Sequence, residues 1–295
     1  MTIRDLGYRA YEGELRPSSN NVWVLTRYGI ARIWGSWINR LAVFGTVLPL
    51  LAMIVIALVR MALLGGRELP EISADEAGQV AWFAAPPAVW LRTLTGIQFW
   101  FVVTVVTLRS GAGVIAEDFT NRAYQFYFAK PVTPLQYIVG RAAALAIFLF
   151  ALVAIPTAIL GVVLAAVGPE EQFLENLGLA LPAQLDAAMI AITCAVLSIA
   201  ISAISKSRAL TMMAWGVVLF VPAVLASLIE GITEHEWGWL ASLPGMLWVT
   251  GDALYKVQRD WEELQWYYAA PLLALLTVGG AYLALRRIQQ AEVIT

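Results

Sequence analysis

Six stretches of the chain are long, apolar and almost free of charged residues. A helix needs roughly 20 apolar residues to cross the hydrocarbon core of a bilayer, and each stretch has about that length. The pattern predicts an all-α, multi-pass membrane protein with six transmembrane helices. The expected spans are residues 41–64, 92–114, 142–167, 185–205, 209–229 and 264–285. A seventh uncharged run, residues 77–91, contains two adjacent prolines and is expected to be interfacial.

Composition supports this pattern. Of the 295 residues, 60% are hydrophobic and 14% are charged, whereas a soluble domain carries about 25% charged residues. The net charge of −2 argues against a nucleic-acid partner, which requires a basic patch. The single cysteine, Cys194, excludes an internal disulfide framework. The single histidine, His235, lies among glutamates, so we expect no metal site there.

Basic residues predict which side of the membrane each loop faces. Six spans place both termini on one side, and Lys and Arg collect on the cytoplasmic side. With the termini inside, 14 of the 19 basic residues are cytoplasmic: six before the first span, four in 109–141, two in 205–208 and two in 286–295. We therefore expect cytoplasmic segments at 1–40 and 286–295 around a transmembrane domain at 41–285, in the inner or plasma membrane. The first forty residues contain no long apolar run, so no cleavable signal peptide is expected.

The segment before the first span has a helical spacing of bulky apolar residues. Trp23, Ile30, Trp34 and Trp37 fall on one side of a helix, and Arg27 falls elsewhere. This pattern is typical of an interfacial helix that lies on the inner leaflet, with its arginines near anionic lipid headgroups. The alternative is a plain arginine-flanked approach to the span.

Motifs of a stand-alone enzyme are missing from the sequence. It has no GxxxxGK[ST] phosphate loop, no HExxH, no CxxC and no GxSxG. Cys194, Ser198 and Ser202 recur every four residues in the fourth span. They are either a mildly polar pathway wall or, as we favour, a seam of small residues where helices pack closely. We expect no cofactor or metal in this chain.

The loop between the second and third spans is charged, aromatic and broken by prolines. Glu117 and Asp118 precede residues 119–129, which can form a short helix whose N-terminus the acidic pair favours. Pro131 would end that helix.

Downstream of this proline, the sequence predicts a second helix start. Thr133 is a plausible N-cap, and Pro134 suits the first helical position.

This loop resembles that of ABC transporter permeases of the ABC-2 type. The overall layout is also similar, with an amphipathic helix, six spans, short inner loops and a long outer loop before the last span. The chain departs from the family pattern at Asn121 and Arg122, where many members have Gly-Thr, and at Pro134, where an arginine is common. The matching residues are Glu117, Asp118, the stretch 119–129, Pro131, Val132, Thr133, Tyr137, Gly140 and Arg141.

The resemblance implies a permease subunit of an ATP-driven exporter. Two copies of a separate ABC ATPase subunit would bind ATP and magnesium, and two permease chains would pair as a homodimer or heterodimer. The first, second and fifth spans would face the pathway between them. The short helix at 119–129 would be a coupling helix that contacts the ATPase. The expected contact residues are Glu117, Asp118, Phe119, Arg122, Phe126, Tyr127, Lys130 and Pro131.

Other interpretations of the same sequence stay open. The short helix could merely shield the inner ends of the spans. The whole chain could be a membrane anchor or sensor that recruits a cytoplasmic protein, since the docking loop would look the same. A stand-alone intramembrane enzyme is disfavoured because no convergent polar residues are found at membrane depth. The aromatic second span is compatible with a hydrophobic cargo, but ordinary packing explains it equally well.

Overall fold

The computed structural model describes residues 20–64, 85–121, 132–257 and 263–293. These residues form helices joined by turns and contain no β-strand. Six helical segments are long and apolar enough to cross a membrane, which confirms the prediction of an all-α chain with six candidate spans. They are Trp37–Leu63, Pro87–Thr120, Pro134–Val167, Glu170–Ile204, Arg208–Thr233 and Trp266–Gln290.

The second and fourth spans are each built from more than one element. Two π-helical turns interrupt the second span. A short 3₁₀-helix begins the fourth span, and another precedes α12. In chain order the elements are α1 (Asn20–Gly35), α2 (Trp37–Leu64), α4 (Pro87–Gln98), η1 (Phe99–Val103), α5 (Thr104–Val106), η2 (Thr107–Gly111), α6 (Val114–Thr120), α8 (Pro134–Val167), η3 (Glu170–Gln172), α9 (Phe173–Gly178), α10 (Ala180–Ile204), α11 (Arg208–Thr233), η4 (Glu236–Ala241), α12 (Leu243–Leu254) and α13 (Trp266–Val293).

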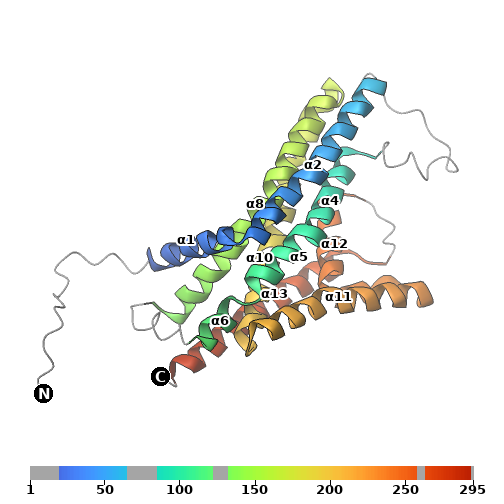
Figure 1. Cartoon of the computed structure of the whole chain (residues 1–295). Coiled ribbons are helices and arrows are strands. Elements are labelled where there is room, and N and C mark those ends of the chain that lie inside the picture. The colour runs from blue at the N-terminus through green and yellow to red at the C-terminus, as the bar shows by residue number, and fades with distance from the viewer. Residues whose placement is uncertain (1–19, 65–84, 122–131, 258–262, 294–295) are drawn as a thin grey trace, which may run out of the picture.

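Three spans form the centre of the bundle and three lie at its edge. In the second, third and fourth spans, 56–67% of the most apolar window is buried, against 17–22% in the others. Figure 1 shows α2 beside α8, α1 crossing α8, and α11 diverging from the bundle. We call the end that holds α6 and the last turns of α13 the α6 end, and the opposite end, where α4 begins, the α4 end.

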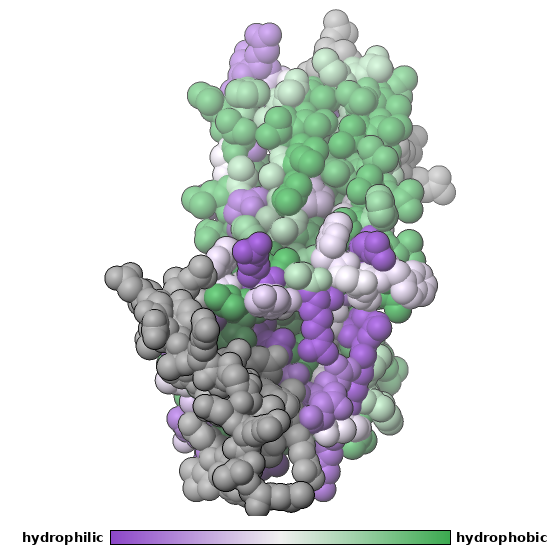
Figure 2. Space-filling model, turned by 60° about the vertical axis from the view of Figure 1, so that its left-hand side comes forward, coloured by the Kyte–Doolittle hydropathy of each residue, from purple (hydrophilic) through white to green (hydrophobic). Residues whose placement is uncertain are grey.

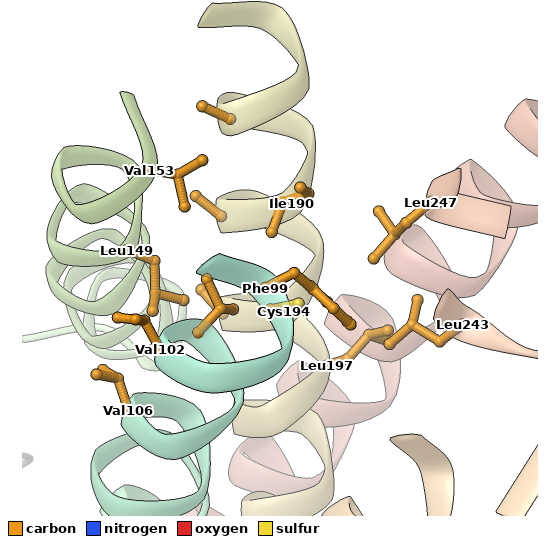
Figure 3. Close-up of a cluster of buried hydrophobic side chains, with 14 of the residues drawn as sticks. Phe99, Val102, Val106, Leu149, Val153, Ile190, Cys194, Leu197, Leu243 and Leu247 are labelled. Atoms are coloured by element: carbon orange, nitrogen blue, oxygen red, sulfur yellow. The ribbon is translucent and has the colours of Figure 1, made fainter. Parts of the chain in front are cut away.

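The main core lies where the second span, α8, α10 and α12 meet. Figure 3 shows its side chains pointing toward one another from these four elements. Smaller apolar clusters lie at each end of the bundle, one around Trp90 and Leu160 and the other around Ile115 and Ile288. The labelled core residues are Phe99, Val102, Val106, Leu149, Val153, Ile190, Cys194, Leu197, Leu243 and Leu247.

Helix α1 packs so closely against α8 that the two backbones nearly touch. A Cβ placed on Gly29 would lie 2.5 Å from the Ala144 Cβ, and one placed on Gly140 would lie 2.6 Å from the Leu25 Cβ. Glycine on both helices therefore permits the close approach. Thr26 adds a hydrogen bond of 3.3 Å from its hydroxyl to the Gly140 carbonyl oxygen.

The residues predicted for the interfacial helix divide between two helices. Trp23, Arg27 and Trp34 lie on the exposed side of α1, and Ile30 is half-buried. Trp37 is also exposed but belongs to α2, because the helix breaks at Ser36. Whether α1 lies at a membrane surface stays a prediction.

The small polar residues of α10 are buried in the bundle. Cys194 belongs to the main core. Ser198 faces the second span, where a Cβ on Gly111 would lie 2.6 Å from its hydroxyl oxygen. These contacts favour the packing seam over a polar pathway wall.

Candidate functional site at the α6 end

The structure has a helix, α6, at Val114–Thr120, just before most of the stretch 119–129 that the sequence predicts to be helical. Residues 122–129 of that stretch lie outside the described residues, and a helix that begins at Val114 was not expected from the sequence. A cap from a distant helix explains this start. The Ser202 hydroxyl oxygen on α10 accepts hydrogen bonds from the backbone N–H groups of Ile115 (3.0 Å) and Ala116 (3.1 Å). These N–H groups of the first turn have no partner within the helix, so a serine 86 residues away stabilises its start.

Glu117 connects three helices. Its carboxylate lies 2.5 Å from the Arg32 guanidinium on α1 and 2.8 Å from the Arg208 guanidinium at the start of α11. Arg208 also donates a hydrogen bond of 2.8 Å to the Arg109 carbonyl oxygen in the second span. Glu117 therefore links α6 to the ends of two peripheral helices.

Asp118 connects α6 to the start of α8. Its carboxylate accepts hydrogen bonds from the Tyr137 hydroxyl (2.5 Å) and from the Arg141 guanidinium (2.6 Å). The Arg32 guanidinium lies 3.9 Å from the other oxygen of this carboxylate. We call Arg32, Glu117, Asp118, Tyr137, Arg141 and Arg208 the α6 cluster.

The predicted start of a helix after the loop is confirmed. Thr133 caps α8 by accepting from the Gln136 N–H (3.2 Å), and its own N–H donates to the Gln136 side-chain oxygen (3.1 Å). Pro134 occupies the start of the helix. Such a reciprocal pair is a capping box.

Some of the predicted partner-contact residues can be placed in the structure. Glu117 and Asp118 lie in α6 as described, and Phe119 packs half-buried on the apolar cluster at the α6 end. The other predicted contact residues lie outside the described residues; they are Arg122, Phe126, Tyr127, Lys130 and Pro131.

A second charged centre, near the α4 end, was missed by the sequence analysis. Arg92 on α4 pairs with Asp186 on α10 (2.9 Å) and with Asp252 on α12 (2.6 Å). We call these three residues the Arg92 centre. They are only 2%, 0% and 3% exposed, respectively. From its sequence context, Arg92 was expected only to begin the second span.

The guanidinium of Arg92 also holds the backbone of α12. It donates hydrogen bonds to the carbonyl oxygens of Leu247 (3.2 Å) and Trp248 (2.9 Å), and it lies 4.9 Å from the centre of the Trp248 ring. A signal for this centre exists in the sequence, because each of its three residues is a lone charge in or beside an apolar stretch. Such charges usually pair inside the bundle.

No protein-family model matches the chain, and no curated protein shows significant sequence similarity to it. The part of the chain that the structure describes also holds no group of three or more His, Cys, Asp or Glu side chains that could bind a metal. Function must therefore be inferred from the arrangement of the α6 end and from the pattern of the loop.

Proposed function

We propose that the chain is a six-span permease subunit of an ATP-driven transporter of the ABC-2 type, in which a separate ATPase subunit drives α6 and the loop that follows it. The observation that carries this proposal is the bonding of α6. This seven-residue helix is joined to α1 and α11 through Glu117, to α8 through Asp118 and to α10 through Ser202.

These bonds would let a force on α6 reach much of the bundle. Hydrogen bonds between ionised groups are roughly twice as strong as neutral ones. Helices α8 and α10 are central, whereas α1 and α11 lie at the edge. A displacement of α6 by an ATPase would therefore act on both parts at once.

A face of the bundle also fits the proposed second permease chain. The second span lies between α2 and α11, with Trp100 of η1 stacked on Phe220 of α11 at 5.7 Å. The residue after Trp100, Phe101, is 72% exposed. An exposed aromatic residue on the second span is compatible with pairing through the first, second and fifth spans, as the family resemblance implies.

Co-purification tests the proposal. The tagged chain is extracted from native membranes in mild detergent, and the mass and ATPase activity of what accompanies it are measured. We expect particles with two permease chains and two ATPase subunits. A chain that comes out alone, with no ATP turnover, would contradict the proposal and favour a membrane anchor or an enzyme.

A double variant then tests whether the loop contacts the ATPase subunit. Phe126→Ala with Lys130→Glu alters expected contact residues that do not belong to the α6 cluster. We expect ATPase binding to fall at least about tenfold, the effect of losing a modest hot spot. The matched control is Phe173→Ala with Glu171→Lys, an exposed pair in η3 and α9, which should leave binding unchanged. Equal binding by both variants would exclude the loop as the coupling element.

The response of ATPase turnover to cargo distinguishes a transporter from a membrane anchor. An ATPase that co-purifies with the chain should change its turnover when the cargo of a transporter is added. A bound ATPase whose turnover responds to no lipid or hydrophobic compound in a screen would indicate that the chain recruits the enzyme without transport.

A further inference from the structure

A pocket of about 280 Å³ opens beside the α6 cluster, among α1, the second span, α6, α8 and the start of α11. We propose that it binds a phosphate group, supplied by the headgroup of an anionic phospholipid or by a soluble phosphorylated compound. This site does not depend on the transporter proposal. The polar residues that carry the argument are Arg32, Ser36, Arg109, Glu117, Arg141 and Arg208.

The pocket has an excess of positive charge. Four arginines line it, while the neighbouring carboxylates are Glu117 and Asp118. Both carboxylates already bind arginine, so they cannot neutralise a further cation. Within the described residues, the Arg109 guanidinium has no ion-pair partner. Guanidinium groups bind phosphate oxygens through paired N–H donors, and Arg109 is free to do so.

Hydroxyl donors complete the lining. The buried Ser36 hydroxyl has no hydrogen-bond partner in the described part of the chain. The Ser110 hydroxyl oxygen accepts from the Asn39 amide at 2.5 Å, which leaves its own proton available to a ligand. Buried polar groups normally have partners. A phosphate oxygen would supply one to Ser36.

Size and position fit a headgroup. A volume of about 280 Å³ corresponds to roughly nine water molecules, enough for a phosphate with its glycerol but not for acyl chains. Figure 2 shows hydrophilic residues gathered on the lower half of the α1 side and hydrophobic residues above them. Basic pockets at such a boundary bind anionic headgroups on the cytoplasmic side of membranes.

Lipid retention tests the site on the full chain purified in neutral detergent. Phosphatidylglycerol and phosphatidylcholine with identical acyl chains are titrated, and bound lipid is counted by native mass spectrometry. We expect wild type to prefer phosphatidylglycerol at least about tenfold. Arg109→Gln should lower its affinity about tenfold, the effect of one charged hydrogen bond. Equal retention of the two lipids by wild type, with no binding of soluble phosphate, would overturn the proposal.

Two further variants separate a built site from general attraction to charge. Arg287→Gln removes the same charge from an exposed position on α13 and should change affinity less than twofold. Ser36→Ala keeps the charge but removes the unpaired hydroxyl, and it should weaken binding several-fold. If Arg109→Gln and Arg287→Gln weaken binding equally, the pocket is not the site.

Competition identifies the source of the phosphate. Glycerol 3-phosphate and inorganic phosphate are added to the lipid-bound protein. Displacement of phosphatidylglycerol, sensitive to Arg109→Gln, would show that a soluble phosphorylated compound also fits. Retention of the lipid against millimolar competitor would assign the pocket to a membrane lipid. Both results support a phosphate site.

Discussion

The Arg92 centre and the α6 cluster both join distant helices through arginine and carboxylate, yet they differ in burial. In the Arg92 centre, one cation lies between two carboxylates and all three side chains are at most 4% exposed. In the α6 cluster, arginines outnumber carboxylates, and the Arg32 side chain is 50% exposed. Arginine–carboxylate pairs therefore occur both fully buried and partly exposed to solvent in this protein.

This difference in burial determines how much free energy it costs each centre to lose or exchange an ion-pair partner. Removing one partner of a buried ion pair typically costs 3–5 kcal/mol, because a charge is left without compensation. An exposed pair contributes only about 0–1 kcal/mol. The Arg92 centre is thus suited to hold α4, α10 and α12 in one arrangement. Within the α6 cluster, the partly exposed pairs of Glu117 with Arg32 and Arg208 can exchange partners at small cost. We therefore expect conformational changes that serve function to occur at the α6 end.

The largest expected effect comes from breaking the Arg92 centre. Arg92→Gln removes the guanidinium that pairs with the buried Asp186 and Asp252, and it also loses two bonds to α12 carbonyls. We expect a loss of about 3–5 kcal/mol in the free energy of unfolding, measured by thermal unfolding of the purified chain in detergent. Arg40→Gln, at an exposed position on α2, is the control.

A triple variant checks the reason for that loss. Arg92→Leu with Asp186→Leu and Asp252→Leu removes the buried guanidinium together with both buried carboxylates of the centre. It should be more stable than Arg92→Gln, as replacing a whole buried ion cluster is often tolerated. A triple variant less stable than Arg92→Gln would show that the ion pairs themselves provide the stability.

A smaller effect is expected within the α6 cluster, where neighbouring carboxylates differ in burial. Asp118→Asn weakens the bonds to Tyr137 and Arg141, two buried side chains, and should cost about 1–3 kcal/mol. Glu117→Gln changes the more exposed pairs with Arg32 and Arg208 and should cost less than about 1 kcal/mol. Hydrogen exchange of the α6 amides measures both. A larger effect for Glu117→Gln would reverse the assignment of which residue anchors α6.

Local patterns predicted much of the fold. Six apolar runs separated by charged loops indicated six spans, and Thr133 with Pro134 indicated the start of α8, since a cap and its helix lie within a few residues of each other. Both features depend only on short-range sequence.

Contacts between distant residues could not be predicted this way. Arg92 lies 94 residues from Asp186 and 160 from Asp252, so no local spacing connects them. The start of α6 at Val114 has the same cause, because Ser202 caps it from another helix. The pocket likewise combines residues from five elements. Sequence reasoning found the loop but not the partners of its charges.

The smallest expected effect near neutral pH concerns Tyr255, which follows α12 and is buried at 3% exposure. Burial raises the pKa of its hydroxyl above the ordinary value of about 10, and the charge of Asp186 raises it further. The folded state therefore holds the proton more tightly than the unfolded state. This contribution is fully present below pH 10 and is lost as the pH rises above that, at up to about 1.4 kcal/mol per pH unit.

Tyr255→Phe should therefore match wild type at pH 8 and be more stable at pH 11, as measured by unfolding temperature. Other groups titrate in this range, so the difference between the two proteins is the relevant quantity. Tyr282→Phe, at an exposed position on α13, should show no such gain. If Tyr255→Phe loses stability with pH as steeply as wild type, the surroundings of the Arg92 centre admit water. The contrast between a closed α4 end and an open α6 end would then fail.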